Sequence, residues 1–363
     1  MDDNFYMDLA IKLALKGEGK VNPNPLVGAV IVKNDEIIGL GYHEHYGKEH
    51  AERNAVKSCN KDMEESTIYV TLEPCFHFGK QPPCVDLIIE KKFKRVVIGM
   101  TDPNPLVAGK SIEKLMENNI EVTVGVREEE CKKLNEIFIK YITTKIPFVL
   151  LKAGMSLDGK IATYTGESKW ITCEESRKDA HKLRNKLYAI MVGINTVLLD
   201  DPELTCRIED GRNPIKIIVD SSLRIPIASK VVKINPHLTI IATTEKVDEN
   251  KKRILEDMGI NIITTSLKNN KVNLNELLQK IGEKNIDSIL IEGGSELNFS
   301  ALEEGIVDKV RFYIAPKILG GNNSKSSIGG QGFSKLSDCV NLNEISYKNI
   351  NDDLIIDGYV MKK

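Results

Sequence analysis

One histidine, two cysteines and one glutamate in the first part of the chain have the types and the spacing of a metal site. His50 and Glu52 form a His-x-Glu pair, and Cys75 and Cys84 each follow a proline with eight residues between them. One histidine with two cysteines is a ligand set of catalytic zinc, which keeps a fourth position for water. Zinc lowers the pKa of that water, and a nearby carboxylate such as Glu52 could carry its proton to a leaving amine.

The order of these residues is more informative than any one of them. A lone His-Ala-Glu occurs by chance in many helices, and a lone cysteine usually packs in a core. Here a strand-like run, Thr67–Leu72, separates the His-x-Glu pair from the two Pro-Cys pairs, as in zinc enzymes that deaminate bases. Most such sites have two residues between the cysteines, so His77 is an alternative third ligand. We favour Cys84, because it opens a helix-like run directly after a proline.

In the second half of the chain, glycines, hydroxyl groups and charges follow strand-like runs. Residues 288–292 lead into Gly293-Gly294-Ser295 and a helix-like segment, where backbone N–H groups could approach a phosphate. An ordinary turn with Ser295 as the helix N-cap explains the same residues equally well. Comparable segments follow residues 148–151 and 189–193, the usual place for ligands in α/β sheets. No G-x-G-x-x-G follows a predicted strand, so a Rossmann site is not expected.

Several side chains in this half have two interpretations. Arg184 and Arg207 could clamp a phosphate, or they could be solvated or ion-paired surface residues, an alternative that suits Arg184 better. Trp170 suits a core or stacking role better than catalysis. The cysteines without matching ligand partners are interpreted as packing residues, and they are Cys59, Cys131, Cys173, Cys206 and Cys339.

Strand-like and helix-like runs alternate along the whole chain, which predicts α/β domains. The strands expected first are 27–32, 67–72 and 95–100, with helices at 49–58, 84–92 and 127–140. A polar stretch that ends at Pro147 predicts a boundary between domains 1–146 and 147–363. The second domain is expected to have strands at 148–151, 189–193, 216–220, 238–242 and 288–292, and helices at 174–186, 248–258, 274–282 and 296–303.

Length and composition agree with an ordinary globular enzyme of two domains. The 363 residues exceed the size of most single cores, and 50 basic against 52 acidic residues give a net charge of −2. That balance argues against a protein that holds duplex nucleic acid by bulk charge. No apolar run is long enough to span a membrane, and the acidic N-terminus does not resemble a signal peptide. Seven irregularly spaced cysteines suggest a reducing, cytoplasmic location rather than a disulfide framework.

The motifs occur in the order of the bifunctional riboflavin-biosynthesis deaminase–reductase family (RibD), which the sequence resembles over nearly its whole length. The segments that carry the resemblance are Asn22–Gly28, His50–Glu52, Glu73–Cys75, Pro82–Cys84, Asp102–Pro105, Lys152–Ala162, Ser168–Thr172, Gly193–Pro202 and Leu204–Arg207. The resemblance implies an α/β chain with an N-terminal cytidine-deaminase-like three-layer domain and a C-terminal dihydrofolate-reductase-like domain. It also implies zinc-dependent deamination of a diaminopyrimidinone ribosylamine phosphate, followed by NADPH-dependent reduction of the ribosyl group to ribityl.

The resemblance implies a role for individual residues. One zinc per chain would be held by His50, Cys75 and Cys84, with Glu52 as the proton shuttle. Substrate contacts would come from Asn24, His43, His77, Lys80, Asp102 and Asn104 in the first domain, and from Lys152, Ser168, Arg184, Leu204, Arg207 and Glu292 in the second. NADPH would contact Gly154, Trp170, Thr196, Asp200, Ser222 and the run Gly294, Ser295, Glu296, Leu297, Asn298, Phe299 and Ser300. The expected partners are this small-molecule substrate and other copies of the chain, with no nucleic acid or membrane.

Residue chemistry alone leaves some of these roles open. Asn24, between two prolines, could simply fix a turn, His43 could be a solvated loop residue, and Asp102 could open a turn. Two other functions are possible for the whole chain: a nucleoside or nucleic-acid deaminase with an unrelated second domain, or a non-catalytic protein that binds flavin precursors. The near-zero net charge counts against the first, and the intact ligand set with Glu52 counts against the second.

Overall fold

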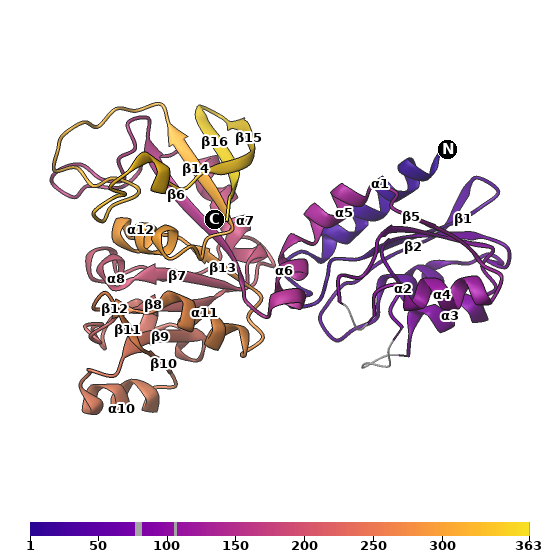
Figure 1. Cartoon of the computed structure of the whole chain (residues 1–363), viewed down its shortest axis with the longest axis horizontal. Helices are drawn as coiled ribbons and strands as arrows, with labels where there is room; N and C mark the ends of the chain where they lie inside the picture. Colours follow the sequence, from indigo (N-terminus) through magenta and orange to yellow (C-terminus); the bar gives the residue numbers. More distant parts are fainter. Residues whose placement is uncertain (77–81, 105–106, 363) are drawn as a thin grey trace. The chain divides into compact units, whose positions relative to one another are not determined.

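The computed structural model describes residues 1–76, 82–104 and 107–362 (Figure 1). The chain forms two compact units, Met1–Lys145 and Ile146–Lys363, and the border lies one residue before the expected one. Each unit has a central sheet with helices on both faces. In the described part of the chain, no helix is long and apolar enough to cross a bilayer.

The first unit is built on a five-stranded sheet in the order β2-β1-β3-β4-β5. Strand β1 is antiparallel to both neighbours, whereas β3, β4 and β5 are parallel. The strands are β1 Gly28–Lys33, β2 Glu36–Tyr42, β3 Thr67–Leu72, β4 Arg95–Met100 and β5 Glu121–Val124. The helices are α1 Asp3–Ala14, η1 Leu15–Gly17, α2 Ala51–Ser58, α3 Cys84–Glu90, α4 Lys110–Glu117, α5 Glu128–Leu134 and α6 Glu136–Thr144.

Both faces of this sheet are buried. Along β1, Ala29 and Ile31 belong to a core shared with α2, α3 and α4, while Val30 and Val32 belong to a core shared with α1 and α5. This alternation is the two-residue period of a strand, and it places the two helix layers on opposite faces (Figure 1). The layers leave one edge of the sheet free for chemistry: the carboxyl ends of β2, β3 and β4 and the amino end of β1.

The second unit is built on a nine-stranded sheet in the order β10-β9-β8-β7-β13-β6-β14-β16-β15. All pairs from β10 to β14 are parallel, and β16 and β15 add an antiparallel hairpin. The strands are β6 Phe148–Ser156, β7 Ala189–Gly193, β8 Ile215–Val219, β9 Thr239–Thr244, β10 Asn261–Thr265, β13 Ser288–Ile291, β14 Lys309–Ala315, β15 Leu342–Ile350 and β16 Asp353–Val360. A separate small ladder pairs β11 Leu267–Lys268 with β12 Lys271–Val272.

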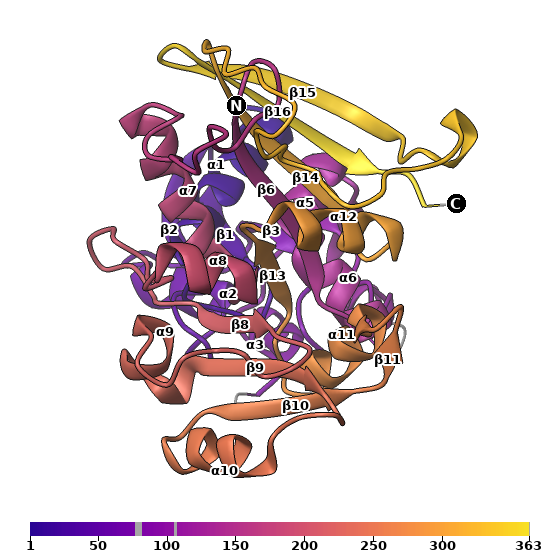
Figure 2. The ribbon, with the colours of Figure 1, turned by 90° about the vertical axis from the view of Figure 1, so that its left-hand side faces the viewer.

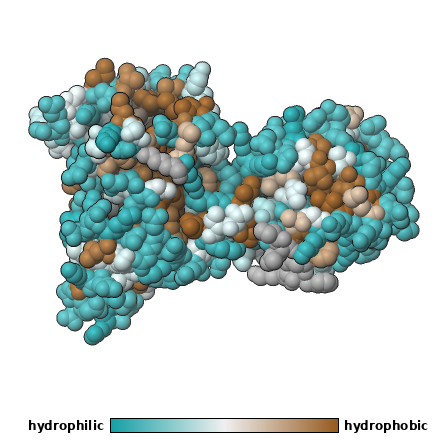
Figure 3. All heavy atoms as spheres, viewed as in Figure 1, coloured by the Kyte–Doolittle hydropathy of each residue, from teal (hydrophilic) through white to brown (hydrophobic). Residues whose placement is uncertain are grey.

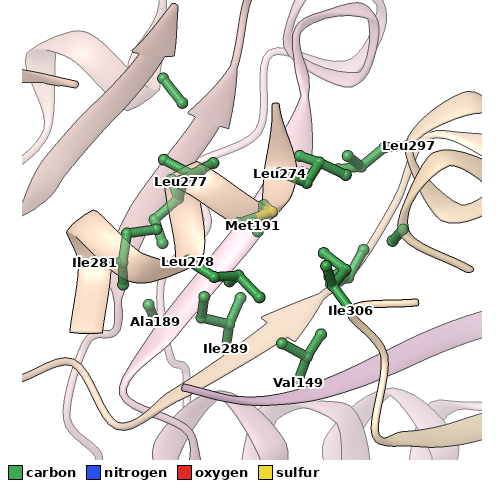
Figure 4. Packing of buried hydrophobic residues seen from close by; sticks show 14 of the residues in the cluster. Val149, Ala189, Met191, Leu274, Leu277, Leu278, Ile281, Ile289, Leu297 and Ile306 are labelled. Atoms are coloured by element: carbon green, nitrogen blue, oxygen red, sulfur yellow. The ribbon is translucent and has the colours of Figure 1, made fainter. Parts of the chain in front are cut away.

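Helices cover both faces of the parallel part of this sheet. They are α7 Glu174–Lys186, α8 Ile194–Asp200, α9 Lys230–Lys233, η2 Pro236–Leu238, α10 Glu249–Asp257, α11 Leu274–Gly282, α12 Ser295–Glu303 and η3 Leu336–Asp338. Helix α11 packs Leu277 and Ile281 against Ala189 and Ile289 of two neighbouring strands (Figure 4). Strand β10 and helix α10 lie at one end of the sheet and the β15–β16 hairpin at the other (Figure 2).

Some predicted elements need correction. Strands β3, β4 and β7 and helices α7 and α11 have the predicted bounds, but the single helix expected at 127–140 is wrong. Two helices meet there at Asn135, a buried residue whose side chain bonds to both backbone groups of Leu26. The sequence did not predict α1, β2, α4, β5, α8, α9, β10 to β12 or β14 to β16.

Candidate active sites

The three predicted zinc ligands meet at the free edge of the first sheet. His50 is the N-cap of α2, Cys84 is the first residue of α3, and Cys75 follows the end of β3. Their ligand atoms all lie within 4.8 Å of one another. The Nδ1 atom of His50 is 3.4 Å from the sulfur of Cys75 and 3.5 Å from that of Cys84. One histidine nitrogen and two sulfurs converging in this way fit zinc.

The surroundings favour the anionic form of one sulfur. The hydrogen bond with the Cys84 thiol, together with the one to His50, lowers the pKa of Cys75 to about 4. The backbone N–H of Cys84 also donates to the Cys75 sulfur, at 3.2 Å. The same thiol–thiol bond and burial raise the pKa of Cys84, and the bond to Cys75 raises that of His50. The thiolate is the form of cysteine that binds metals, so the site is prepared for a cation.

Glu52 lies in the first turn of α2, where only 3% of it is exposed. Burial raises the pKa of its carboxyl, and the nearby sulfur of Cys75 adds to the effect. His50 acts in the opposite direction. A carboxyl with a raised pKa next to a metal site can hold a proton and release it, which is the property that a proton shuttle needs.

His43 and Asn24 lie together beside the cluster. His43 is buried, which lowers its pKa, so the interpretation as a solvated loop residue is wrong. Its Nδ1 lies 2.9 Å from the carbonyl of Glu49 and must donate there, so its Nε2 accepts from the Asn24 amide at 3.2 Å. The ring also stands edge-on to His50, at 5.5 Å between centroids. Because burial lowers the pKa of His43, the neutral ring is favoured, and in that form Nε2 accepts from the amino group of Asn24.

Two further predicted substrate residues of this unit, Asp102 and Asn104, follow β4. The carboxylate of Asp102 accepts from the backbone N–H of Asn104, and the carbonyl of Asn104 accepts from Val107 and Ala108. These bonds tie Asp102 and Asn104 together beyond the carboxyl end of β4, at the same edge of the sheet as the zinc ligands. His77 and Lys80 lie outside the described residues.

A glycine turn occupies the carboxyl end of β13 in the second unit. Gly293 and Gly294 have φ values of 149° and 86°, which side chains on L-residues rarely allow, and Gly294 is the N-cap of α12. A Cβ on Gly294 would lie 3.4 Å from the hydroxyl of Thr196, in the first turn of α8. The structure therefore brings Gly294 and Thr196 together at the ends of the neighbouring strands β13 and β7, beside a helix N-terminus that no side chain caps.

Glu292, directly before this turn, is the centre of a charge cluster that is largely shielded from solvent, with 6% of its own side chain and 18% of that of Arg184 exposed. Arg184 donates to its two carboxylate oxygens at 2.6 and 2.8 Å and to the carbonyl of Thr205 at 2.9 Å. The Nζ of Lys152 lies 3.7 Å from the same carboxylate and 5.7 Å from the centre of the Tyr313 ring. Burial alone would raise the pKa of Glu292, but the charges of Arg184 and Lys152 lower it to about 2. Arg184 is thus ion-paired, as one of the sequence alternatives has it, but its side chain is only 18% exposed, so it is not a solvated surface residue.

The other predicted residues of this unit are more scattered. Leu204 is buried, and Arg207 is exposed with its guanidinium 3.4 Å from Glu203. Trp170 is 62% exposed, with the Arg177 guanidinium 4.5 Å from the centre of its ring, so a core role is wrong and a stacking role toward a ligand stays a prediction. Gly154 lies within β6, Asp200 ends α8, Ser222 follows β8, and Ser168 is part of the loop before Trp170.

Within α12 the predicted cofactor residues divide into two groups. Leu297 and Phe299 point into the interior, where Phe299 meets Phe333, and Asn298 is buried with its amide bonded to the carbonyl of Ser327. Because these side chains are buried, NADPH could contact Leu297, Asn298 and Phe299 only through their backbone groups. The side chains of Ser295 and Glu296 contact the glycine loop after residue 328, and Ser300 is the sixth residue of the helix.

Comparison with known proteins covers both units. Residues 147–356 match the family model "RibD C-terminal domain", and residues 1–100 match "Cytidine and deoxycytidylate deaminase zinc-binding region". A protein of Actinobacillus pleuropneumoniae named "Riboflavin biosynthesis protein RibD" is 49% identical over 99% of this chain and 96% of its own length. The chain belongs to the RibD family. A protein of the same name from Aquifex aeolicus is 45% identical over 98% of this chain and 97% of its own length.

Solved RibD structures share the fold along the whole length. "Acinetobacter baumannii RibD, form 1" is 34% identical, with a TM-score of 0.89 and 99% of each chain covered. A deaminase/reductase from Thermotoga maritima is 38% identical, with a TM-score of 0.84 over 99% of this chain and 98% of that one. The cytidine-deaminase-like and dihydrofolate-reductase-like fold expected from the sequence is confirmed. The RibD enzymes are bifunctional deaminases and reductases of riboflavin biosynthesis with zinc and NADPH as cofactors, and this chain is one of them.

Three contacts that support the deaminase site of this RibD chain were missed from the sequence. Arg53 donates to the carbonyl of Pro82, just before the ligand Cys84. Asn135 holds both backbone groups of Leu26, two residues after Asn24. Glu73, which precedes the Pro-Cys pair of the ligand Cys75, is buried, and its carboxylate accepts several hydrogen bonds. The His-x-Glu and Pro-Cys pairs are local signals, whereas these contacts join segments far apart in the sequence.

Proposed function

We propose that this chain catalyses the two reactions for which the Thermotoga maritima protein is named, a "diaminohydroxyphosphoribosylaminopyrimidine deaminase/ 5-amino-6-(5-phosphoribosylamino)uracil reductase". The first unit replaces an amino group of the pyrimidine ring by oxygen, and the second reduces the ribosyl group to ribityl. The observation that carries the proposal is the meeting of His50, Cys75 and Cys84 within 4.8 Å beside the buried Glu52.

In the first unit, each described residue has a distinct task. His50, Cys75 and Cys84 would hold zinc, which supplies a Lewis acid that makes water a nucleophile near neutral pH. Glu52 takes a proton from the attacking water and delivers it to the amine, so that ammonia leaves. Its raised pKa suits this exchange, because the carboxyl can hold the proton between the two transfers. The amide of Asn24, held by His43, contributes to binding of the ring and its ribose phosphate.

In the second unit, the charge cluster and the glycine turn divide the work. The backbone N–H groups that open α12 after Gly294 bind a phosphate of NADPH, which supplies the hydride when it is bound. Thr196 lies at the same turn. Lys152 and Arg184 carry the positive charge that the substrate phosphate requires, and Glu292 holds both in place. We propose that Asp200 and Ser222 make further contacts with NADPH, and that Leu204 and Arg207 make further contacts with the substrate.

The setting of the enzyme is also part of the proposal. All seven cysteines are free, which supports a reducing, cytoplasmic compartment. The pyrimidine ribosyl phosphate is its small-molecule partner, and we propose no nucleic-acid or membrane partner. A second copy of the chain is proposed to pair with the second unit, where hydrophobic residues gather on the face at the upper left of Figure 3 and where Ile345, in the edge strand β15, is exposed. A monomeric mass in light scattering would contradict this.

One incubation tests both activities. The purified chain is mixed with the diaminopyrimidine ribosylamine phosphate, with and without NADPH, and the product is analysed by mass spectrometry. Without NADPH, the product should have gained water and lost ammonia, a net replacement of NH by O. With NADPH, it should in addition have gained two hydrogens. Unchanged substrate in both samples would contradict the proposal.

A further inference from the structure

The carboxylate of Glu73 lies between two loops of the deaminase site. Glu73 is the first residue after β3, and Cys75 follows it by two residues. Only 3% of Glu73 is exposed. A buried carboxylate is costly unless its oxygens are bonded, so its partners indicate what it is for.

Four donors reach this carboxylate, and all of them belong to the segment after β4. One oxygen accepts from the backbone N–H of Asp102 and of Gly109, each at 3.1 Å. The other accepts from the backbone N–H and the hydroxyl of Ser111, at 3.3 and 2.5 Å. Gly109 is the N-cap of α4, and no side chain of its own segment caps that helix. Glu73 therefore supplies the acceptor and the negative charge that the start of α4 requires.

We infer that Glu73 is a positioning residue for deamination, which anchors the loop carrying Asp102 and Asn104 to the strand end carrying Cys75. This inference rests on the proposed function, because it assigns a task to the substrate loop of the same site. The anchor sets the distance between the substrate loop and the metal ligand through one side chain. Glu73 itself is fully engaged with the protein and touches no reacting atom.

The substitution Glu73→Gln tests the anchor with almost no change in shape. An amide has one acceptor oxygen and one amino group, so two of the four donors would face an N–H group and lose their partner. The loop should then shift or loosen. The resemblance places Asp102 and Asn104 around the pyrimidine and its ribose phosphate, and we propose that they bind parts of the substrate that do not react. On that basis we expect the KM of deamination to rise about tenfold or more, while kcat changes less than about threefold.

Three readouts accompany the kinetics. Zinc content should stay at that of the unmodified chain, and the reductase rate on deaminated substrate should not change. Amide hydrogen exchange should become faster at Asp102, Gly109 and Ser111.

Two further variants serve as comparisons. Ser111→Ala removes only the bond from the hydroxyl and should raise the KM less than Glu73→Gln does. Glu113→Gln removes an exposed carboxylate from the first turn of the same helix and should change neither the KM nor the exchange.

The possible results separate this inference from the proposed function. An unchanged KM in Glu73→Gln overturns the inference, and so does a loss of kcat or zinc without a rise in KM, which would mean that Glu73 supports the metal. If the unmodified chain does not deaminate the substrate at all, the proposed function fails. In that case the exchange rates still decide whether Glu73 anchors the loop.

Discussion

Glu52 combines burial in the first turn of α2 with a raised pKa. Glu52→Gln keeps the size of the side chain and removes the proton carrier. We expect the deamination rate to fall by roughly 10² to 10⁴, with zinc retained and reduction of deaminated substrate unaffected. Steady-state kinetics of both reactions on the same preparation measure this.

A matched control comes from the turn before α2. Glu49 has an ion pair with Lys57 and no part in the proposed chemistry, so the deamination rate of Glu49→Gln should stay close to that of the unmodified chain. A Glu52→Gln protein that deaminates at a normal rate would exclude Glu52 as the shuttle.

Cys84 was preferred over His77 as the third ligand because it opens a helix, and the structure places its sulfur with the other two ligand atoms. Cys84→Ser should therefore lower the zinc content of protein purified without added metal, as measured by elemental analysis. Cys59→Ser, at a partly exposed cysteine outside the cluster, should retain the metal. Full zinc occupancy in Cys84→Ser would show that another residue is the third ligand.

The low pKa of Glu292 has a consequence for stability. Its value of about 2 in the folded chain lies below the ordinary 4.5, so the unfolded chain takes up this proton at a higher pH than the folded chain. The stabilisation is complete above about pH 5 and is lost as the pH falls towards 2. Urea unfolding at several pH values should show the free energy of unfolding of the second unit falling between about pH 5 and pH 2. In Glu292→Gln this dependence on pH should be smaller.

The same substitution has a cost at neutral pH. Glu292→Gln leaves Arg184 buried without its ionic partner, and the free energy of unfolding should fall by about 3–5 kcal/mol. A variant as stable as the unmodified chain at pH 7 would mean that the ion pair does not hold α7 to the sheet.

At the scale of elements, the turn between β13 and α12 should control how tightly NADPH binds. Gly294 has a φ of 86°, and its Cβ position faces the hydroxyl of Thr196 at 3.4 Å. A valine there is strained and fills the approach to the helix N-terminus. Gly294→Val should raise the NADPH dissociation constant strongly, measured by fluorescence titration, and leave deamination intact.

The control for backbone strain lies in the same unit. Gly259 has nearly the same φ, 87°, and a Cβ there meets nothing within 4 Å. Gly259→Val therefore carries a similar conformational cost away from the turn, and its NADPH affinity should be normal. Equal effects of the two substitutions would attribute the loss to general destabilisation.

The sequence predicted elements whose signals are local. Strand β3 is a continuous β-branched and apolar run, and α7 has charged residues around a short buried stripe. Helix α4 was missed because its start is capped by Glu73, from another part of the chain. The split between α5 and α6 was missed for the same kind of reason, since it depends on the bonds between Asn135 and Leu26.

In the candidate sites too, the sequence predicted what depends on local spacing and missed what depends on contacts between distant segments. The zinc ligands and Glu52 were found because their spacing carries the chemistry. The buried pairing of Arg184 with Glu292 joins a helix to a distant strand end, so the sequence could name both residues but could not show that they meet. The burial of His43 also depends on segments that the sequence does not place beside it.

For the whole molecule, the division into two units makes the two activities separable. Each unit has its own hydrophobic cores on the two faces of its sheet. A chain with Glu52→Gln and a chain with Gly294→Val should each fail to make the final product alone. Mixed, they should restore it, because the first unit of one chain supplies substrate to the second unit of the other.

This mixing experiment is read by mass spectrometry of the final product. The unmodified chain at the same total concentration is the reference. A mixture no more active than either variant alone would mean that the intermediate does not leave the chain on which it is made.

The order of strands in the second sheet bears on how the protein is made. Strand β6 is the first of its unit to be synthesised, yet both of its neighbours, β13 and β14, come late in the chain. On the ribosome, β6 therefore emerges long before any strand that can pair with it, and non-local pairing of this kind folds slowly. The first unit has all of its strands within its own shorter segment, and domains generally fold as they emerge. The deaminase half is thus expected to be complete, and able to take up its metal, while the reductase half still waits for its last strands.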